Sequence, residues 1–277
     1  IDDALACYRF KGQWLEDEGM EGCRMGGEAE GVWRFFNTTP KGVRWQKARA
    51  QMKAGKPHGF HKEYYPTGRL RVEGQTENGH ETGLWKGYFP GGQLAFEVNW
   101  LAGKRTGPVH EWYTNCQLSQ SGQFEAGEKS GRWTSWFVNG RKKDEGDYLR
   151  GRKHGEWSLY DEHGPKLSAG PFVDGVKSGA WTEWFLNGVK WQTVEFANGV
   201  RQGEAELKCH KDGGTWTVDH KKREQGCVIE KQRVGRWTGY FPSGTLSWAG
   251  EHANGLLDGT YIEYHKSGKI LTEGYYR

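Results

Sequence analysis

The sequence predicts an all-β protein, an elongated twisted sheet or solenoid of stacked β-hairpins with about 24 residues per repeat. One observation is a glycine that returns at a fixed interval, at Gly59, Gly83, Gly107, Gly131, Gly155, Gly179 and Gly203. Another is that aromatic residues recur at fixed offsets from this glycine. Aromatic residues make up 14% of a chain whose mean hydropathy is −0.90. The buried surface must therefore consist mostly of rings, which each bury a large area.

Each repeat divides into two strand-like runs. Counting from the repeat glycine as zero, tryptophan is usual at +2 and tyrosine or tryptophan at +5, as at Trp85 and Tyr88. Further glycines stand at +9, +15 and +20, and the first of these lies in a turn such as Pro90-Gly91-Gly92. Aromatic-rich runs separated by glycine-bearing turns predict a β-hairpin. A helical repeat is excluded because each interior glycine would cost about 1 kcal/mol.

The pattern divides the chain into four parts. Residues 1–30 are expected to form a cysteine-containing cap on the first sheet edge, and residues 31–208 the repeat array. Residues 209–234 interrupt the repeat with a second cysteine-containing module, and residues 235–277 carry the last two repeats. The second module could start a new short array.

The cysteines form two similar modules. Cys7 and Cys209 are each followed by a glycine after five residues and a tryptophan after seven, and a glycine directly precedes Cys23 and Cys227. We predict the local disulfides Cys7–Cys23 and Cys209–Cys227, each contributing roughly 3 kcal/mol, and hence an oxidising compartment. A metal site is not expected, because C-x-x-C spacing is absent. Cys116 replaces a turn glycine and is expected to be a free thiol, with an intermolecular link as the alternative.

Charge and hydropathy argue against nucleic-acid binding and against a transmembrane segment. The net charge of +4 is too small to predict nucleic-acid binding, and no apolar run is long enough for a transmembrane segment. The sequence begins with Ile1 rather than Met, so we expect an upstream segment, which could be a secretion signal or a lipid anchor.

The repeat resembles a known family. Gly83-Leu84-Trp85 with Tyr88-Phe89, and Gly131-Arg132-Trp133 with Glu145-Gly146-Asp147-Tyr148, are similar to the MORN repeat. The variant is the bacterial one found in proteins often labelled YwqK-type antitoxins, and the resemblance covers about residues 31–277. It implies a repeat sheet used for binding or scaffolding, with no catalytic residues to carry over. Family members are linked to membrane lipids, protein partners and, by label, toxin neutralisation. The cysteine modules depart from the common pattern and disfavour a cytoplasmic antitoxin.

One candidate surface is aromatic. Offsets +2 and +5 have opposite parity in a strand, so their side chains should emerge on opposite faces. An exposed ladder of rings would suit sugars, lipid or peptide, although cross-strand neighbours that cover the rings are the favoured interpretation for both columns. The candidate binding stripe is Tyr88, Trp112, Trp136, Tyr160 and Trp184.

A second candidate surface is basic. Cations recur at matching offsets in the loops between repeats and could attract anionic lipid headgroups or an acidic partner. Lysines on loops also keep sheets soluble, and we favour this interpretation. The candidate basic edge is Lys104, Arg105, Lys129, Arg152, Lys153 and Lys177.

No catalytic, cofactor-binding or metal-binding residues are expected. The histidines scatter, and the glutamates repeat once per unit, whereas an acid–base pair would occur once. We therefore expect a non-enzymatic binding or scaffold module, periplasmic or on the cell surface, for a protein or cell-envelope component. The alternatives are an antitoxin-like inhibitor of a toxin, which predicts reduced cysteines, and a surface protein that binds glycan or anionic lipid.

Overall fold

A computed structural model describes residues 2–277, and the side chains of Asp2 and Glu204 as well as Ile1, the first residue of the expected cap, lie outside the described residues. The chain divides into two compact units, one ending at Gly140 and the other beginning at Arg141. Each unit is described by itself.

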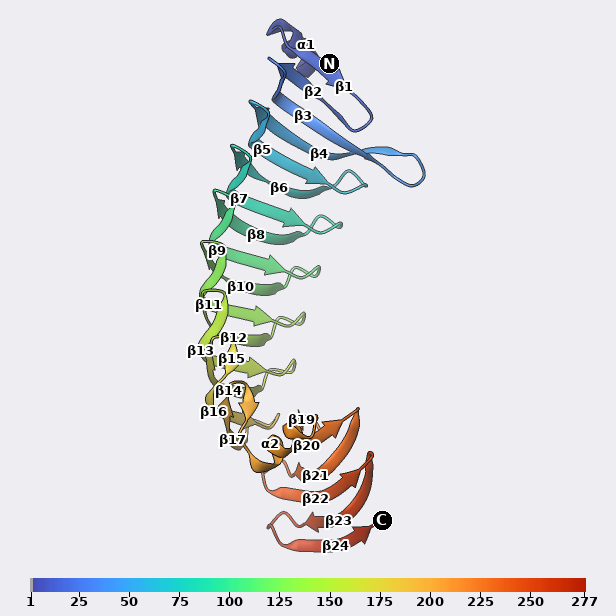
Figure 1. Ribbon diagram of the computed structural model, residues 1–277, viewed down its shortest axis with the longest axis vertical. Coiled ribbons are helices and arrows are strands. Elements are labelled where there is room, and N and C mark those ends of the chain that lie inside the picture. The colour runs from blue at the N-terminus through green and yellow to red at the C-terminus, as the bar shows by residue number, and fades with distance from the viewer. Residues whose placement is uncertain (1) are drawn as a thin grey trace. The chain divides into compact units, whose positions relative to one another are not determined.

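The first unit is a run of antiparallel strands that follows a short helix, α1 (Asp2–Arg9). Each strand pairs with the next one along the chain, as Figure 1 shows. The strands are β1 (Gln13–Glu16), β2 (Met20–Met25), β3 (Glu28–Thr38), β4 (Arg44–Lys53), β5 (Lys56–Tyr64), β6 (Leu70–Glu77), β7 (His80–Tyr88), β8 (Leu94–Leu101), β9 (Lys104–Trp112), β10 (Leu118–Glu125) and β11 (Glu128–Trp136).

The second unit contains two antiparallel sheets on either side of helix α2 (Glu204–Lys211). The first sheet holds β12 (Lys142–Leu149), β13 (Arg152–Tyr160), β14 (Lys166–Val173), β15 (Val176–Lys177), β16 (Gly179–Trp184), β17 (Lys190–Ala197) and β18 (Val200–Arg201). The other, six-stranded sheet holds β19 (Thr215–Asp219), β20 (Glu224–Ile229), β21 (Gln232–Tyr240), β22 (Leu246–Ala253), β23 (Leu256–Tyr264) and β24 (Ile270–Tyr276). The expected all-β fold of consecutive hairpins is confirmed in both units.

The +9 glycines close the hairpins. Gly92 has φ 95°, and its N–H donates to the carbonyl of Phe89 at 2.8 Å. A positive φ is readily adopted by glycine, which lacks a β-carbon. The glycine that recurs at +9 in the sequence is therefore a requirement of the turn.

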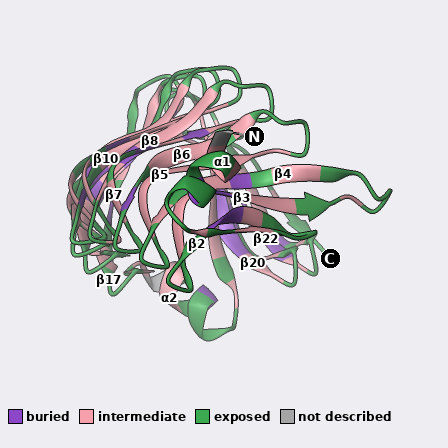
Figure 2. Cartoon of the chain, turned by 90° about the horizontal axis from the view of Figure 1, so that it is seen from above, coloured by how far each residue is buried: buried purple, intermediate pink, exposed green. Residues whose placement is uncertain are grey.

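The +2 tryptophans form the core of the sheet. Trp157 is 2% exposed, and its indole Nε1 donates to the carbonyl of Asp147 at 3.0 Å. Tyr148 and Phe172 meet the ring edge to face, with ring centres 5.3 and 5.8 Å away. Figure 2 shows buried residues within the strands and exposed residues at the turns. The same offset is buried at Trp33, Trp85, Trp133, Trp181 and Trp237.

The +15 glycine makes room for this core. A β-carbon on Gly146 would lie 2.3 Å from Cδ2 of Trp157, which is far inside van der Waals contact. The same close approach to the next ring occurs at Gly22, Gly74, Gly122, Gly170 and Gly226. The two most regular features of the sequence, glycine at +15 and tryptophan at +2 of the next repeat, are thus one packing unit.

The two cysteine modules share a helix followed by two strands. Disulfides join Cys7 to Cys23 and Cys209 to Cys227, as the sequence predicted. A β-carbon on Gly12 or Gly214 would lie within 3 Å of both sulfurs of its disulfide, which explains the glycine five residues after the first cysteine. The sequence indicated no helix in either module, and α2 begins before residue 209, where the second module was expected to start.

Candidate functional site

The candidate stripe lies on the face opposite the tryptophan core. In the first unit, Tyr88, Trp112 and Trp136 are half-buried. Tyr88 stands three residues after the buried Trp85 in the same strand, so the two side chains point to opposite faces. In the second unit, Tyr160 and Trp184 are also half-buried, and Lys166 Nζ lies 5.7 Å from each ring centre.

Neighbouring polar side chains fix some of these rings. The Tyr88 hydroxyl donates to Glu73 Oε1 at 2.8 Å, and Lys62 Nζ lies 3.0 Å from Glu73 Oε2. Burial, followed by the hydrogen bond to Glu73, raises the pKa of Tyr88 to about 12. Hydrogen bonds from Lys62 and Tyr88 lower the pKa of Glu73. The stripe therefore presents ring surface held in a set orientation, beside charged groups.

The candidate basic edge divides between two environments. Lys104 and Arg152 are exposed. Lys129, Lys153 and Lys177 instead place their Nζ atoms 3.9, 3.8 and 3.9 Å from the ring centres of the core tryptophans Trp133, Trp157 and Trp181, respectively. Arg105 is exposed, but its Cζ lies 5.6 Å from the Trp100 ring and 5.2 Å from the Phe124 ring.

Contact with the core changes the lysine chemistry. Burial lowers the pKa of Lys153, with Asp144 acting in the opposite direction, and burial likewise lowers the pKa of Lys177. A cation over an aromatic face is held by the ring quadrupole. These lysines stabilise the sheet interior, so the exposed cations of the candidate edge are Lys104 and Arg105 in the first unit and Arg152 in the second.

A hollow in the second unit, lined by both apolar and charged side chains, was not anticipated from the sequence. Its volume is about 520 Å³, and it lies between the first sheet and the second cysteine module. The sheet contributes Lys177, Glu183 and Phe196, and the module contributes Glu206 and Trp216.

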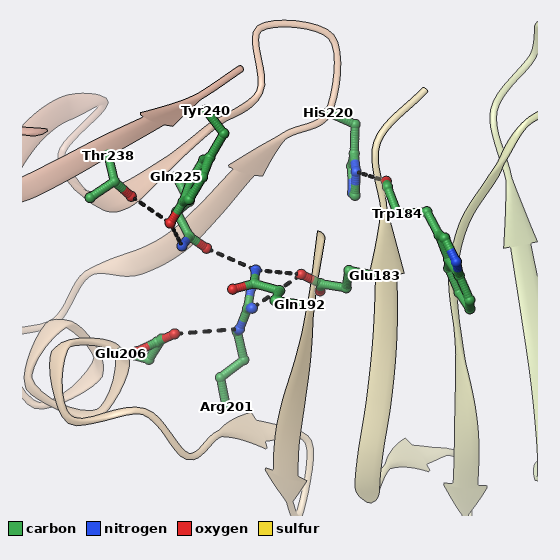
Figure 3. A network of polar contacts seen from close by, with 9 residues as sticks. All are labelled: Glu183, Trp184, Gln192, Arg201, Glu206, His220, Gln225, Thr238 and Tyr240. Carbon is green, nitrogen blue, oxygen red and sulfur yellow. Dashed lines mark hydrogen bonds and ion pairs between the residues drawn. The ribbon is translucent and has the colours of Figure 1, made fainter. Parts of the chain in front are cut away.

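A chain of hydrogen bonds and ion pairs crosses beside this hollow (Figure 3). Glu183, 5% exposed, accepts from Gln192 Nε2 at 2.8 Å and from Arg201 Nη2 at 3.2 Å. Arg201, 9% exposed, also lies 3.8 Å from Glu206 on α2, between Nε and Oε1. Gln192 Nε2 continues to Gln225 Oε1 at 3.1 Å.

The same network of hydrogen bonds reaches the second sheet. Gln225 Nε2 donates to the Tyr240 hydroxyl at 2.9 Å, and Thr238 Oγ1 lies 3.2 Å from that hydroxyl. His220 Nδ1 is 3.1 Å from the Trp184 carbonyl. The network therefore ties β16 and β17 to α2, β20 and β21 within this unit.

The sequence does contain a signal for this cluster. Glu183, Gln192 and Arg201 are spaced nine residues apart, and Glu111, Gln120 and Lys129 show the same spacing three repeats earlier. In the first unit, Gln120 Nε2 donates to Glu111 Oε2 at 2.6 Å and Lys129 Nζ donates to Gln120 Oε1 at 3.3 Å. The triad is thus a feature of the repeat, and the second module buries one copy of it.

Membrane-spanning helices and metal-binding clusters are both absent among the described residues. None of the helices within residues 2–277 is long and apolar enough to cross a membrane. In the same range, no group of three or more His, Cys, Asp or Glu side chains is placed to hold a metal ion.

Comparison with known proteins identifies the repeat. The family model described as MORN repeat variant matches residues 81–102 and 257–277. No curated protein is similar to the chain in sequence. A solved structure described as the GtfA/B complex bound to UDP and GlcNAc aligns at 10% identity with a TM-score of 0.19, covering 41% of this chain and 22% of that one.

Proposed function

Because the chain is a MORN-repeat protein, we propose that it is a non-enzymatic scaffold that docks a protein or another cell-envelope component outside the cytoplasm. MORN repeats are generally binding or scaffold repeats. The partner, the compartment and the absence of catalysis are parts of the proposal.

The half-exposed ring stripe supports the docking role. The +2 tryptophans are buried in both units, whereas the +5 rings of the stripe keep part of their surface in solvent on the other face. Tyrosine and tryptophan are enriched at the energetic centres of protein interfaces. A partner that covers Trp112 and Trp136 would bury ring surface that the fold itself leaves open.

The disulfides support the extracytoplasmic location. In both modules a glycine lies so close to the two sulfurs that a β-carbon would not fit, so the bridges are part of the local packing. Disulfides of this structural kind persist in oxidising compartments and are rare in the cytosol. Alkylation of cells denatured directly in the alkylating agent should label Cys116 alone; labelling of all five cysteines would favour the antitoxin alternative, which predicts a reducing cytoplasm.

The docking role is tested with the double variant Trp112→Ala/Trp136→Ala. Partners captured from envelope fractions by the oxidised protein are identified, and their affinities for both proteins are then measured. We expect binding at least about thirtyfold weaker, since two central aromatic anchors of this kind contribute 2 kcal/mol or more. Unchanged affinity in a variant that unfolds at the same temperature as the parent would refute the stripe.

The double variant Lys104→Ala/Arg152→Ala is the matched control. Both residues are exposed and carry charge rather than ring surface. If this variant loses binding and the stripe variant does not, with binding weakened by salt, the site is electrostatic and the anionic-lipid alternative is favoured.

A further inference from the structure

The hollow of the second unit has an uneven lining. Its apolar residues are Leu159, Leu167, Phe196 and Val218. They are interspersed with Lys177 and with the buried Arg201 and its two carboxylate partners, and the Phe196 ring lies 5.0 Å from Lys177 Nζ. The volume of about 520 Å³ is in the range of small-molecule sites.

The register of the repeat shows what the hollow lacks. In three repeats the cation two residues before a repeat glycine lies beside an oxygen-bearing side chain nine positions earlier, whereas the residue nine positions before Arg105 is Phe96. The pairs are Lys129 with Gln120 at 3.3 Å, Lys153 with Asp144 at 3.8 Å, and Arg233 with Glu224. For Lys177 the corresponding residue is Ser168, which is too short to occupy the same space, and both residues line the hollow.

The donors of the hollow are incompletely satisfied within residues 2–277. The Lys177 ammonium lies over the Trp181 and Phe196 rings, at 3.9 and 5.0 Å, and is attracted electrostatically to Glu183. The buried Trp216 Nε1 has no hydrogen-bond partner, and the buried Arg201 Nε has no hydrogen bond but forms a 3.8 Å ion pair with Glu206 Oε1. Buried donors without acceptors are costly, and each corresponds to an oxygen that the site could accommodate.

We propose that this hollow binds a small organic carboxylate with an apolar body. The carboxylate takes the place that a glutamine or acidic side chain occupies in those three repeats and accepts from Lys177. The apolar part lies against Phe196 and Val218. A single negative charge fits better than a phosphate dianion, because Glu183 and Glu206 already stand beside the cations.

The charge state of Lys177 is consistent with this assignment. Burial lowers its pKa, and the carboxylate of Glu183 compensates only in part. A bound anion would raise that pKa again, so the protein should take up protons when the ligand binds at alkaline pH. Titration calorimetry in two buffers of different ionisation enthalpy measures this uptake.

The experiment uses the full chain with both disulfides intact and phenylacetate as the probe. Binding is followed by calorimetry and by the NMR signal of the Trp216 indole N–H. We expect saturable binding of phenylacetate, a shift of this signal, and at least about tenfold weaker binding of the neutral isostere phenylacetamide. N-acetylphenylalanine and its amide form a second pair, which distinguishes a peptide C-terminus from a free acid as the source of the carboxylate.

Three variants locate the site. Ser168→Asp restores the carboxylate of the repeat and should abolish phenylacetate binding, as should Lys177→Met. Lys129→Met changes the equivalent lysine of the first unit, which does not line the hollow, and should leave the affinity unchanged. If either variant does not fold, Ser168→Asn decides the question, because it offers Lys177 an amide oxygen, as Gln120 does for Lys129, without placing a second carboxylate opposite Glu183.

The proposal is overturned by any of three results. These are no binding of either acid up to about 10 mM, equal binding of the acid and amide, or a folded Ser168→Asp protein that binds phenylacetate as the parent does. Equal binding of acid and amide would indicate a neutral hydrogen-bonding ligand, such as a sugar.

Discussion

Trp157 lies directly on Gly146, so closely that a β-carbon on this glycine would come within 2.3 Å of indole Cδ2. Gly146→Ala should therefore force the ring out of its place and destabilise the protein by about 1–3 kcal/mol, the usual cost of overpacking. Urea unfolding measures the change.

Gly274→Ala is the matched control for this substitution. Gly274 stands at the same +15 offset, but nothing lies within 4 Å of the position of its β-carbon. Its replacement should change the free energy of unfolding by less than about 0.5 kcal/mol. Equal effects of the two substitutions would contradict the pairing of tryptophan and glycine as the packing unit.

Burial of Tyr88 and its hydrogen bond to Glu73 should make stability depend on alkaline pH. The folded state raises the pKa of Tyr88 from 10.0 to about 12, so the stability contributed by the neutral, hydrogen-bonded hydroxyl is fully present below pH 10 and is lost as pH rises through 12. Tyr88→Phe should be less stable than the parent by about 1 kcal/mol at pH 8.

That difference should shrink between the unfolded and folded pKa values of Tyr88. Comparing the parent with Tyr88→Phe at each pH removes the contribution of other titrating groups. A stability difference that stays constant from pH 8 to about pH 12 would show that folding does not raise the pKa of Tyr88.

Cys116 occupies a turn position that suits glycine. Its φ is 64°, and its N–H donates to the Tyr113 carbonyl at 2.9 Å, as Gly92 and Gly140 do in their turns. Cys116→Gly should stabilise the protein by about 1 kcal/mol, because a side chain is disfavoured in left-handed backbone. Thermal unfolding measures the gain.

Cys116→Ser separates the backbone effect from the loss of the thiol. It keeps a β-carbon in the same conformation, so its stability should remain close to that of the parent. Stabilisation by serine equal to that by glycine would place the effect in thiol chemistry.

The core could be predicted from sequence because its chemistry is periodic. Tryptophan at +2 and glycine at +15 recur at one spacing, and a close contact between them is what each repeat must preserve. The disulfides were likewise predictable, since Cys7–Cys23 and Cys209–Cys227 belong to two copies of one local motif.

The basic edge could be predicted only in part. Arg152 and Lys153 are sequence neighbours, and successive residues of a strand point to opposite faces. Arg152 is exposed, whereas Lys153 covers the Trp157 ring. Matching offsets alone did not distinguish the two environments. Whether a cation is exposed or covers a core ring depends on which of the alternating strand positions points to the core face.

The hollow was not predictable from the repeat. Ser168, Lys177 and Glu183 look unremarkable in their separate strands, and only the register places them together. The module that covers them contains a helix at Glu204–Lys211, where the sequence gives no apolar periodicity of the helical kind. The sequence feature that indicates the polar cluster beside the hollow is the equal, nine-residue spacing of Glu183, Gln192 and Arg201.

The most direct test of the account compares the two ring columns by hydroxyl-radical footprinting with mass spectrometry. The free protein should show faster oxidation at Trp112, Trp136 and Trp184 than at Trp133, Trp157 and Trp181, and a bound partner should protect the first set only. Equal oxidation of both sets, or partner protection confined to the second set, would contradict a core of +2 rings with a docking stripe of +5 rings.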